Sequence, residues 1–251
     1  TVVTGISTGA LSAPFAFLGP DYDDALKRVY TETTSDMIFS KETPLLAILS
    51  SDAVTDSTPL KDLIASFLDE EMIRRIGAEY DKGRLLLVAT TNLDQARSVI
   101  WNIGAIAKSP DPRARNLIIE VLRASASIPG AFPPVMLDVT VNGKRYEEMH
   151  VDGGAMQQIF LYPPQLKLKT VERGFNAKKH RDVAYIIRNG RLFRPEQSVQ
   201  RQTLAIAGQA IATMTAANGV NDLYRIYLTT RRDGVDYNLA FLDDAFDTPY
   251  V

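Results

Sequence analysis

A serine near the start of the chain has the sequence surroundings of a catalytic nucleophile. Ser7 is the centre of GISTG, a Gly-X-Ser-X-Gly pattern that follows a short β-branched run and precedes small and apolar residues. On such a sharp strand-to-helix turn a serine stands clear of its own backbone, and Gly5 and Gly9 let the strand and the helix pass close together. We therefore interpret Ser7 as the candidate nucleophile of an acyl transfer.

The helix expected after Ser7 offers a donor for the charge that acyl transfer creates. The first N–H groups of a helix have no acceptor within the helix, and they lie at the positive end of its dipole. Negative charge develops on the carbonyl oxygen of the substrate during the reaction. The backbone N–H of Thr8 is therefore our candidate donor to this oxyanion.

A carboxylate in a suitable setting follows much later in the chain. Residues 135–141 and 144–151 flank Asn142 and Gly143, a strong hairpin signal, and the second strand leads into the sequence DGG. In this motif Asp152 precedes Gly153 and Gly154, so the carboxylate can lie against other backbone without a side chain in its way. We interpret Asp152 as the candidate general base; an aspartate that opens an ordinary turn is the alternative.

The two histidines offer another way to activate the serine, because a nucleophilic serine usually works with a histidine held by a carboxylate. His180 lies in a basic stretch, residues 178–181, which is typical of a solvated surface. His150 stands two residues before Asp152, so on a regular strand the two side chains point to the same side and lie beside each other rather than in series. A serine–aspartate pair fits better, and a histidine-assisted esterase is the alternative.

A third motif lies between these two candidates. Residues 124–134 read ASASIPGAFPP, in which small residues run into a turn fixed by three prolines. Small side chains let a helix end lie against another backbone, and proline restricts the exit at low entropic cost. We expect a rigid segment here, with Pro129 as a structural residue of the site.

GISTG, ASASIPGAFPP and DGG, in this order, resemble the motifs of the patatin-like phospholipases, a family of lipid acyl hydrolases. The resemblance covers nearly the whole chain. It implies a three-layer α/β/α fold and a serine–aspartate dyad that needs no metal and no organic cofactor. It assigns Ser7 as the nucleophile and Asp152 as the base, and it implies a lipid or acyl-ester substrate, including one presented at a membrane surface. A catalytically silent domain that retains this fold is the rival from another functional class.

Two features of the chain differ from the family pattern. The family carries a glycine-rich oxyanion loop upstream of the serine, whereas this chain opens at Thr1 inside the expected strand, so we expect the natural N-terminus to lie further upstream. After DGG the family often has asparagine and proline, whereas this chain continues with Ala155 and Met156 and reaches a proline only at Pro163. The compartment of the protein is not indicated by the sequence.

The composition is that of an ordinary globular protein. The chain has 251 residues, of which 45% are hydrophobic and 23% charged, and we expect a single α/β domain over residues 1–251. A formal net charge of −2 provides no broad basic face for nucleic acid, and the lack of cysteine excludes disulfides and thiolate chemistry. The sequence contains no run of eighteen apolar residues, so it predicts no membrane-spanning helix.

Alternating strand and helix patterns predict a mostly parallel central sheet. A loop-broken apolar insertion, residues 31–83, is expected to supply packing helices and part of a cap. The expected strands are 84–91, 97–107, 135–141, 144–151, 182–188, 223–230 and 237–242. The expected helices are 11–30 with a break at Gly19 and Pro20, 58–76, 113–127 and 197–217.

Overall fold

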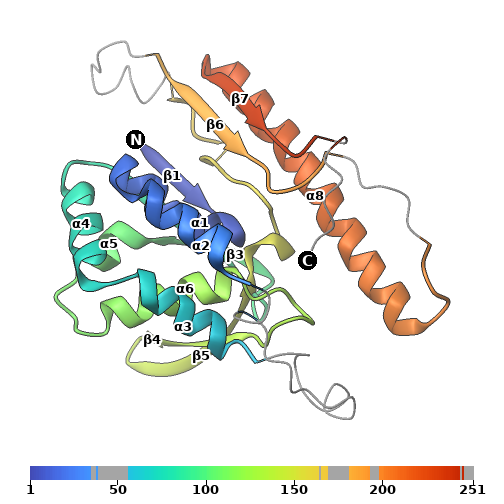
Figure 1. The fold of residues 1–251 in the computed structure, drawn as a ribbon, viewed down its shortest axis with the longest axis horizontal. Coiled ribbons are helices and arrows are strands. Elements are labelled where there is room, and N and C mark those ends of the chain that lie inside the picture. The colour runs from blue at the N-terminus through green and yellow to red at the C-terminus, as the bar shows by residue number, and fades with distance from the viewer. Residues whose placement is uncertain are drawn as a thin grey trace. The chain divides into compact units, whose positions relative to one another are not determined.

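The computed structural model describes residues 1–34, 38, 56–163, 165–168, 181–192, 198–243 and 245. The chain forms two compact units, Thr1–Met156 and Gln157–Val251, and each is described by itself (Figure 1). The single domain expected over the whole chain stays a prediction. His180 and the centre of the predicted cap segment, residues 39–55, lie outside the described residues.

The sheet of the first unit is mixed rather than mostly parallel. Its strands are β1 (Val2–Gly5), β2 (Leu85–Asn92), β3 (Arg97–Asn102), β4 (Val135–Val141) and β5 (Lys144–Asp152). Of the pairings described in this sheet, only that of β1 with β2 is parallel. For two of the antiparallel pairs the reason is the length of the connections: residues 93–96 join β2 to β3, and Asn142 and Gly143 join β4 to β5. Connections this short cannot make the crossover that parallel neighbours need.

Strand β2 carries both β1 and β5 on one of its edges. Strand β3 pairs with β2 along residues 87–92, so it occupies the other edge. Strand β1 pairs with residues 85–88 and β5 with residues 90–92, and both pairings overlap that of β3. Because β1 is parallel and β5 antiparallel to β2, the carboxyl ends of β1 and β5 point toward each other. They meet beside residues 88–90 of β2.

Six helices of the first unit are described, and several of them pack against β2. The six are α1 (Thr8–Leu18), α2 (Asp23–Glu32), α3 (Thr58–Phe67), α4 (Glu70–Asp81), α5 (Ile103–Ala107) and α6 (Ala114–Ser125), with a short 3₁₀ turn η1 (Pro20–Tyr22) before α2. Leu86 and Val88 alternate along β2, and both belong to a buried cluster that contains Phe15 of α1, Ile64 of α3 and Leu122 of α6. The family's three-layer arrangement stays a prediction.

The predicted strand at residues 97–107 is wrong in its second half. Strand β3 ends at Asn102 and helix α5 follows at once. The Asn102 side chain caps this helix, because its Oδ1 accepts a hydrogen bond of 3.0 Å from the backbone N–H of Ala105. Gly104 lets the helix lie against α4, since a Cβ at this position would be 2.7 Å from the Tyr80 ring. Capping and tertiary contact override the apolar, strand-like pattern.

The second unit contains strands β6 (Val183–Ile187) and β7 (Asp236–Ala240), which are parallel, and the long helix α8 (Thr203–Asp233). Figure 1 shows α8 running alongside the β6/β7 pair. The predicted strand at residues 223–230 is wrong, because these residues belong to α8. Within this stretch Leu223, Ile226 and Thr230 are the buried positions, which is helical spacing.

Candidate active site

The serine of GISTG lies on a strained turn between β1 and α1. Ser7 has φ 56° and ψ −127°, a conformation that is rare for any residue other than glycine. Such a residue costs about 1–3 kcal/mol and persists only where its surroundings fix it. Here the backbone N–H of Ala10 donates to the Ser7 carbonyl over 2.8 Å, and that of Gly9 donates to the Ile6 carbonyl over 2.8 Å. The strand, sharp turn and helix occur where the sequence predicts them.

The two glycines of the motif have different roles. A Cβ at Gly5 would be 2.4 Å from the carbonyl oxygen of Gly9, which no side chain tolerates, so the strand and the helix approach each other at Gly5. A Cβ at Gly9 would meet no atom within 4 Å. The expectation that both positions must lack a side chain for this packing is therefore correct for Gly5 and wrong for Gly9.

Asp152 is the last residue of β5, and hydrogen bonds to the backbone of Ser127 and Gly154 hold it in place. Its N–H donates to the Ser127 carbonyl over 2.8 Å. Its Oδ1 accepts a 2.7 Å hydrogen bond from the N–H of Gly154, in the 3₁₀ turn η3 (Gly153–Ala155). Gly153 lies so close to β2 that a Cβ would be 2.6 Å from the Ala89 carbonyl oxygen. The DGG motif thus places the carboxylate at the junction of β1, β2 and β5.

The structure brings Ser7 and Asp152 together at this junction. The Ser7 hydroxyl lies beside the Asp152 carboxylate, which is only 5% exposed, and interacts with it closely enough to lower its pKa. Burial raises the pKa of Asp152 to about 6, while the hydrogen bonds from Ser7 and from the N–H of Gly154 act in the opposite direction. The carboxylate is therefore ionised at neutral pH, and it is a stronger base than an ordinary aspartate.

Thr8 and Pro129 both lie between Ser7 and Asp152 in the chain. Thr8 is the first residue of α1, so its N–H is one of the first N–H groups of the helix, which have no acceptor within it. Pro129 is exposed in the turn that follows α6. A 3.0 Å hydrogen bond from the N–H of Ala131 to the Ile128 carbonyl closes this turn. Its predicted role at the site stays a prediction.

His150 belongs to a separate buried network. Its side chain has no exposed surface, and its Nδ1 lies 2.8 Å from the Thr90 hydroxyl, which accepts from the Trp101 indole N–H over 2.9 Å. Its Nε2 lies 3.2 Å from a carboxylate oxygen of Glu148. Burial lowers the pKa of His150, and Glu148 opposes this effect. Both ring nitrogens thus face partners other than Ser7.

Comparison with known protein families agrees with the geometry of the site. The model of the patatin-like phospholipases matches residues 1–164. The chain belongs to this family. The resemblance seen in the sequence is thereby confirmed over residues 1–164, which contain Ser7, the segment 124–134 and Asp152, whereas its expected extent over nearly the whole chain stays a prediction. The patatin-like phospholipases are typically lipid hydrolases, and they have an α/β fold. No curated protein matches the chain.

The patatin-like segment 124–134 contributes a residue that the sequence analysis did not single out. Ser125, the last residue of α6, accepts a 3.1 Å hydrogen bond from the N–H of Ser7 and donates one of 2.7 Å to the Ala89 carbonyl. The small residues of this segment predict a close approach to other backbone. Nothing in the pattern distinguishes the hydroxyl of Ser125 from that of Ser127.

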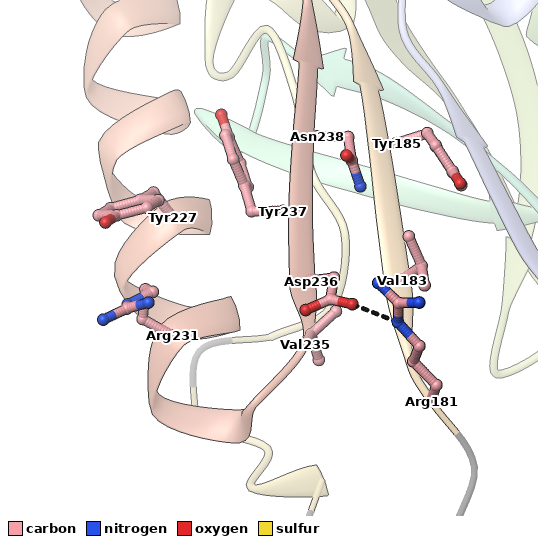
Figure 2. A pocket seen from close by; sticks show the side chains of 9 residues that line it. All are labelled: Arg181, Val183, Tyr185, Tyr227, Arg231, Val235, Asp236, Tyr237 and Asn238. Carbon is pink, nitrogen blue, oxygen red and sulfur yellow. Dashed lines mark hydrogen bonds and ion pairs between the residues drawn. The ribbon is translucent and has the colours of Figure 1, made fainter.

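A pocket of about 450 Å³ lies outside the patatin-like match, in the second unit. Its lining comes from β6, β7, α8 and the residues beside them, and Figure 2 shows Arg181 paired with Asp236 and Tyr227 beside Tyr237. Neither Ser7 nor Asp152 lines it. We therefore place the candidate active site at the junction in the first unit.

Neither a metal centre nor a membrane helix is found in the part of the chain that the structure describes. No three histidine, cysteine or acidic side chains in it are grouped so as to hold a metal ion. No helix in it is both long and apolar enough to cross a membrane.

Proposed function

We propose that this protein is a lipid acyl hydrolase that cleaves carboxylic esters, as a phospholipase A does, with Ser7 and Asp152 as a catalytic dyad. The observation that carries the proposal is the Ser7 hydroxyl lying beside the buried Asp152 carboxylate, whose pKa is raised to about 6 by burial. A base of this strength accepts a proton more readily than an ordinary carboxylate and is still ionised at neutral pH. Family membership supports the substrate class.

In the proposed reaction the Ser7 oxygen attacks the ester carbonyl carbon while its proton passes to Asp152. The N–H of Thr8 and the positive end of the α1 dipole stabilise the oxyanion that forms. When this intermediate collapses, the alcohol leaves with the proton from Asp152, and the acyl group stays on Ser7. Water, deprotonated by Asp152, then attacks the acyl-enzyme, and Asp152 returns this proton to the Ser7 oxygen as the acyl group leaves. The products are a carboxylic acid and a free Ser7 hydroxyl, so atoms and protons balance over the cycle.

The test uses Ser7→Ala and Asp152→Asn in the full-length chain, with a short acyl ester and a phospholipid as substrates. Both variants are expected to lose hydrolysis by several orders of magnitude, and Ser7→Ala is expected to lose labelling by a fluorophosphonate. Asp222→Asn is the matched control, because Asp222 has the same 5% exposure but caps backbone N–H groups in the second unit. Wild-type rates in either dyad variant would refute the proposal.

A further inference from the structure

The carboxyl end of α6 contacts both members of the proposed dyad. The Ser125 hydroxyl accepts from the backbone N–H of Ser7 over 3.1 Å, and two residues later the Ser127 carbonyl accepts from the backbone N–H of Asp152 over 2.8 Å. Ser7 and Asp152 are far apart in sequence and lie on different strands. One short segment thus holds the backbone of each.

Ser125 contacts β2 at a residue that pairs with neither β1 nor β5 on this edge of the strand. Pairing of β1 with β2 ends at Val88, and pairing of β5 with β2 begins at Thr90, so Ala89 lies between the two strands that share this edge. The Ser125 hydroxyl donates to the Ala89 carbonyl over 2.7 Å, and Ser125 is completely buried. This hydroxyl therefore bonds to β2 at a position where neither β1 nor β5 pairs with it, and it also accepts the hydrogen bond from the N–H of Ser7.

The backbone of Ser7 needs such support. Its positive φ is unfavourable for a residue with a side chain, and an unfavourable conformation persists only where neighbouring contacts fix it. The Ser7 carbonyl is held by the N–H groups of Ala10 and Leu11 in α1. The N–H of Ser7 lies beyond β1 and before α1, and Ser125 is its acceptor.

We propose that Ser125 is a positioning residue of the active site, whose buried hydroxyl ties the N–H of Ser7 to the Ala89 carbonyl of β2 and so keeps the Ser7 hydroxyl within hydrogen-bond reach of Asp152. This inference rests on the proposed function of the dyad. It assigns Ser125 no contact with the reacting atoms. Ser125 acts through the backbone of Ser7.

Removal of the hydroxyl tests this role. Ser125→Ala leaves a buried donor and a buried acceptor without partners, so we expect kcat to fall about 10- to 100-fold while KM changes less than about twofold. The rate of fluorophosphonate labelling of Ser7 is expected to fall by a similar factor. Ser125→Cys keeps a weakly hydrogen-bonding group of similar size and is expected to fall between the wild type and Ser125→Ala; it also serves as the test if Ser125→Ala does not fold.

The pH profile separates positioning from general loosening of the fold. The hydrogen bond from Ser7 lowers the pKa of Asp152, so a displaced hydroxyl moves the acid limb of kcat to higher pH. Water entering a loosened site would relieve the burial that raises this pKa, and the limb would move to lower pH. A limb at higher pH supports the inference, whereas a limb that stays in place or moves to lower pH overturns it.

Ser57→Ala is the matched control. Ser57 is 1% exposed, and its hydroxyl accepts a 2.7 Å hydrogen bond from Arg123 of α6, so its loss also removes a buried hydroxyl next to this helix. We expect Ser57→Ala to lose stability but to keep kcat. Equal losses of kcat in Ser57→Ala and Ser125→Ala, or a wild-type kcat in Ser125→Ala or Ser125→Cys, would overturn the inference. If Ser7→Ala, assayed in parallel, kept its activity, the proposed function itself would fail.

Discussion

The buried carboxylate of Asp152 should make the protein less stable above pH 6, and Asp152→Asn should reverse this effect. The pKa of Asp152 rises from 3.8 to about 6 on folding because the native state buries the charge. The native state therefore binds a proton more tightly than the unfolded state, and stability is lost as the pH rises from about 4 to about 6. One pKa unit corresponds to about 1.4 kcal/mol, so ionised Asp152 lowers the free energy of unfolding by about 3 kcal/mol at pH 8.

Asparagine has nearly the same shape and stays neutral, so it removes this penalty. Linkage predicts that Asp152→Asn is more stable than the wild type by up to about 3 kcal/mol at pH 8 and by about 1 kcal/mol at pH 4.5. The same variant should be inactive, which is typical of a residue that serves activity at the expense of stability.

Urea unfolding followed by tryptophan fluorescence measures this difference. Trp101 is the single tryptophan of the chain and lies in the first unit, where its indole N–H donates to Thr90. Asp69→Asn is the control in the same unit, because Asp69 caps α4 with a 2.7 Å bond to the N–H of Met72 and asparagine caps helices equally well. Its stability should change by less than about 0.5 kcal/mol at both pH values. A lower stability of Asp152→Asn at pH 8, or a gain that is the same at both pH values, would refute the reasoning.

Three further predictions concern the same site. Wild-type hydrolysis should need ionised Asp152, so kcat/KM should fall about tenfold for each pH unit below 6 and reach a plateau above pH 7; a pH-independent rate between pH 4.5 and 7 would contradict this role. Gly5→Ala should prevent folding or destabilise the protein by more than about 3 kcal/mol, whereas Gly9→Ala should unfold at the same or a higher urea concentration, because its Cβ meets no atom and alanine favours helix. His150→Gln should keep the acid limb near pH 6; loss of that limb together with activity would favour a histidine-assisted mechanism.

Much of the fold could be predicted because its signals are local. Asn142 and Gly143 adopt the positive φ angles, 50° and 77°, of the tight turn that the sequence predicts between β4 and β5. The error at residues 223–230 has the opposite cause. Tyrosine, isoleucine and threonine in this stretch favour a strand, but Leu223 and Ile226 bury one face of α8 beside β6, and this packing outweighs local preference.

The residues of the candidate site could be named from the sequence, but their arrangement in space could not. Ser7 and Asp152 could be named because each lies in a glycine-containing motif whose backbone needs are visible in the sequence. Their contact depends on β1 and β5 sharing one edge of β2, and no local pattern encodes which strands share an edge. Ser125 was missed for the same reason, since its partners Ser7 and Ala89 are remote in sequence.

The gap in the sheet explains how Asp152 of the proposed dyad is buried while Ser7 lies beside it. A continuous strand along this edge of β2 would cover Ala89 and leave no room for side chains to converge. Because β1 and β5 end there, the Ala89 carbonyl is approached by two small groups. The Ser125 hydroxyl lies 2.7 Å from it, and Gly153 lies so near that a Cβ would be 2.6 Å from it. The residues are small because the backbones converge, and that convergence desolvates Asp152 enough to raise its pKa. The packing of the sheet edge and the basicity of the proposed catalytic group are therefore two consequences of one arrangement.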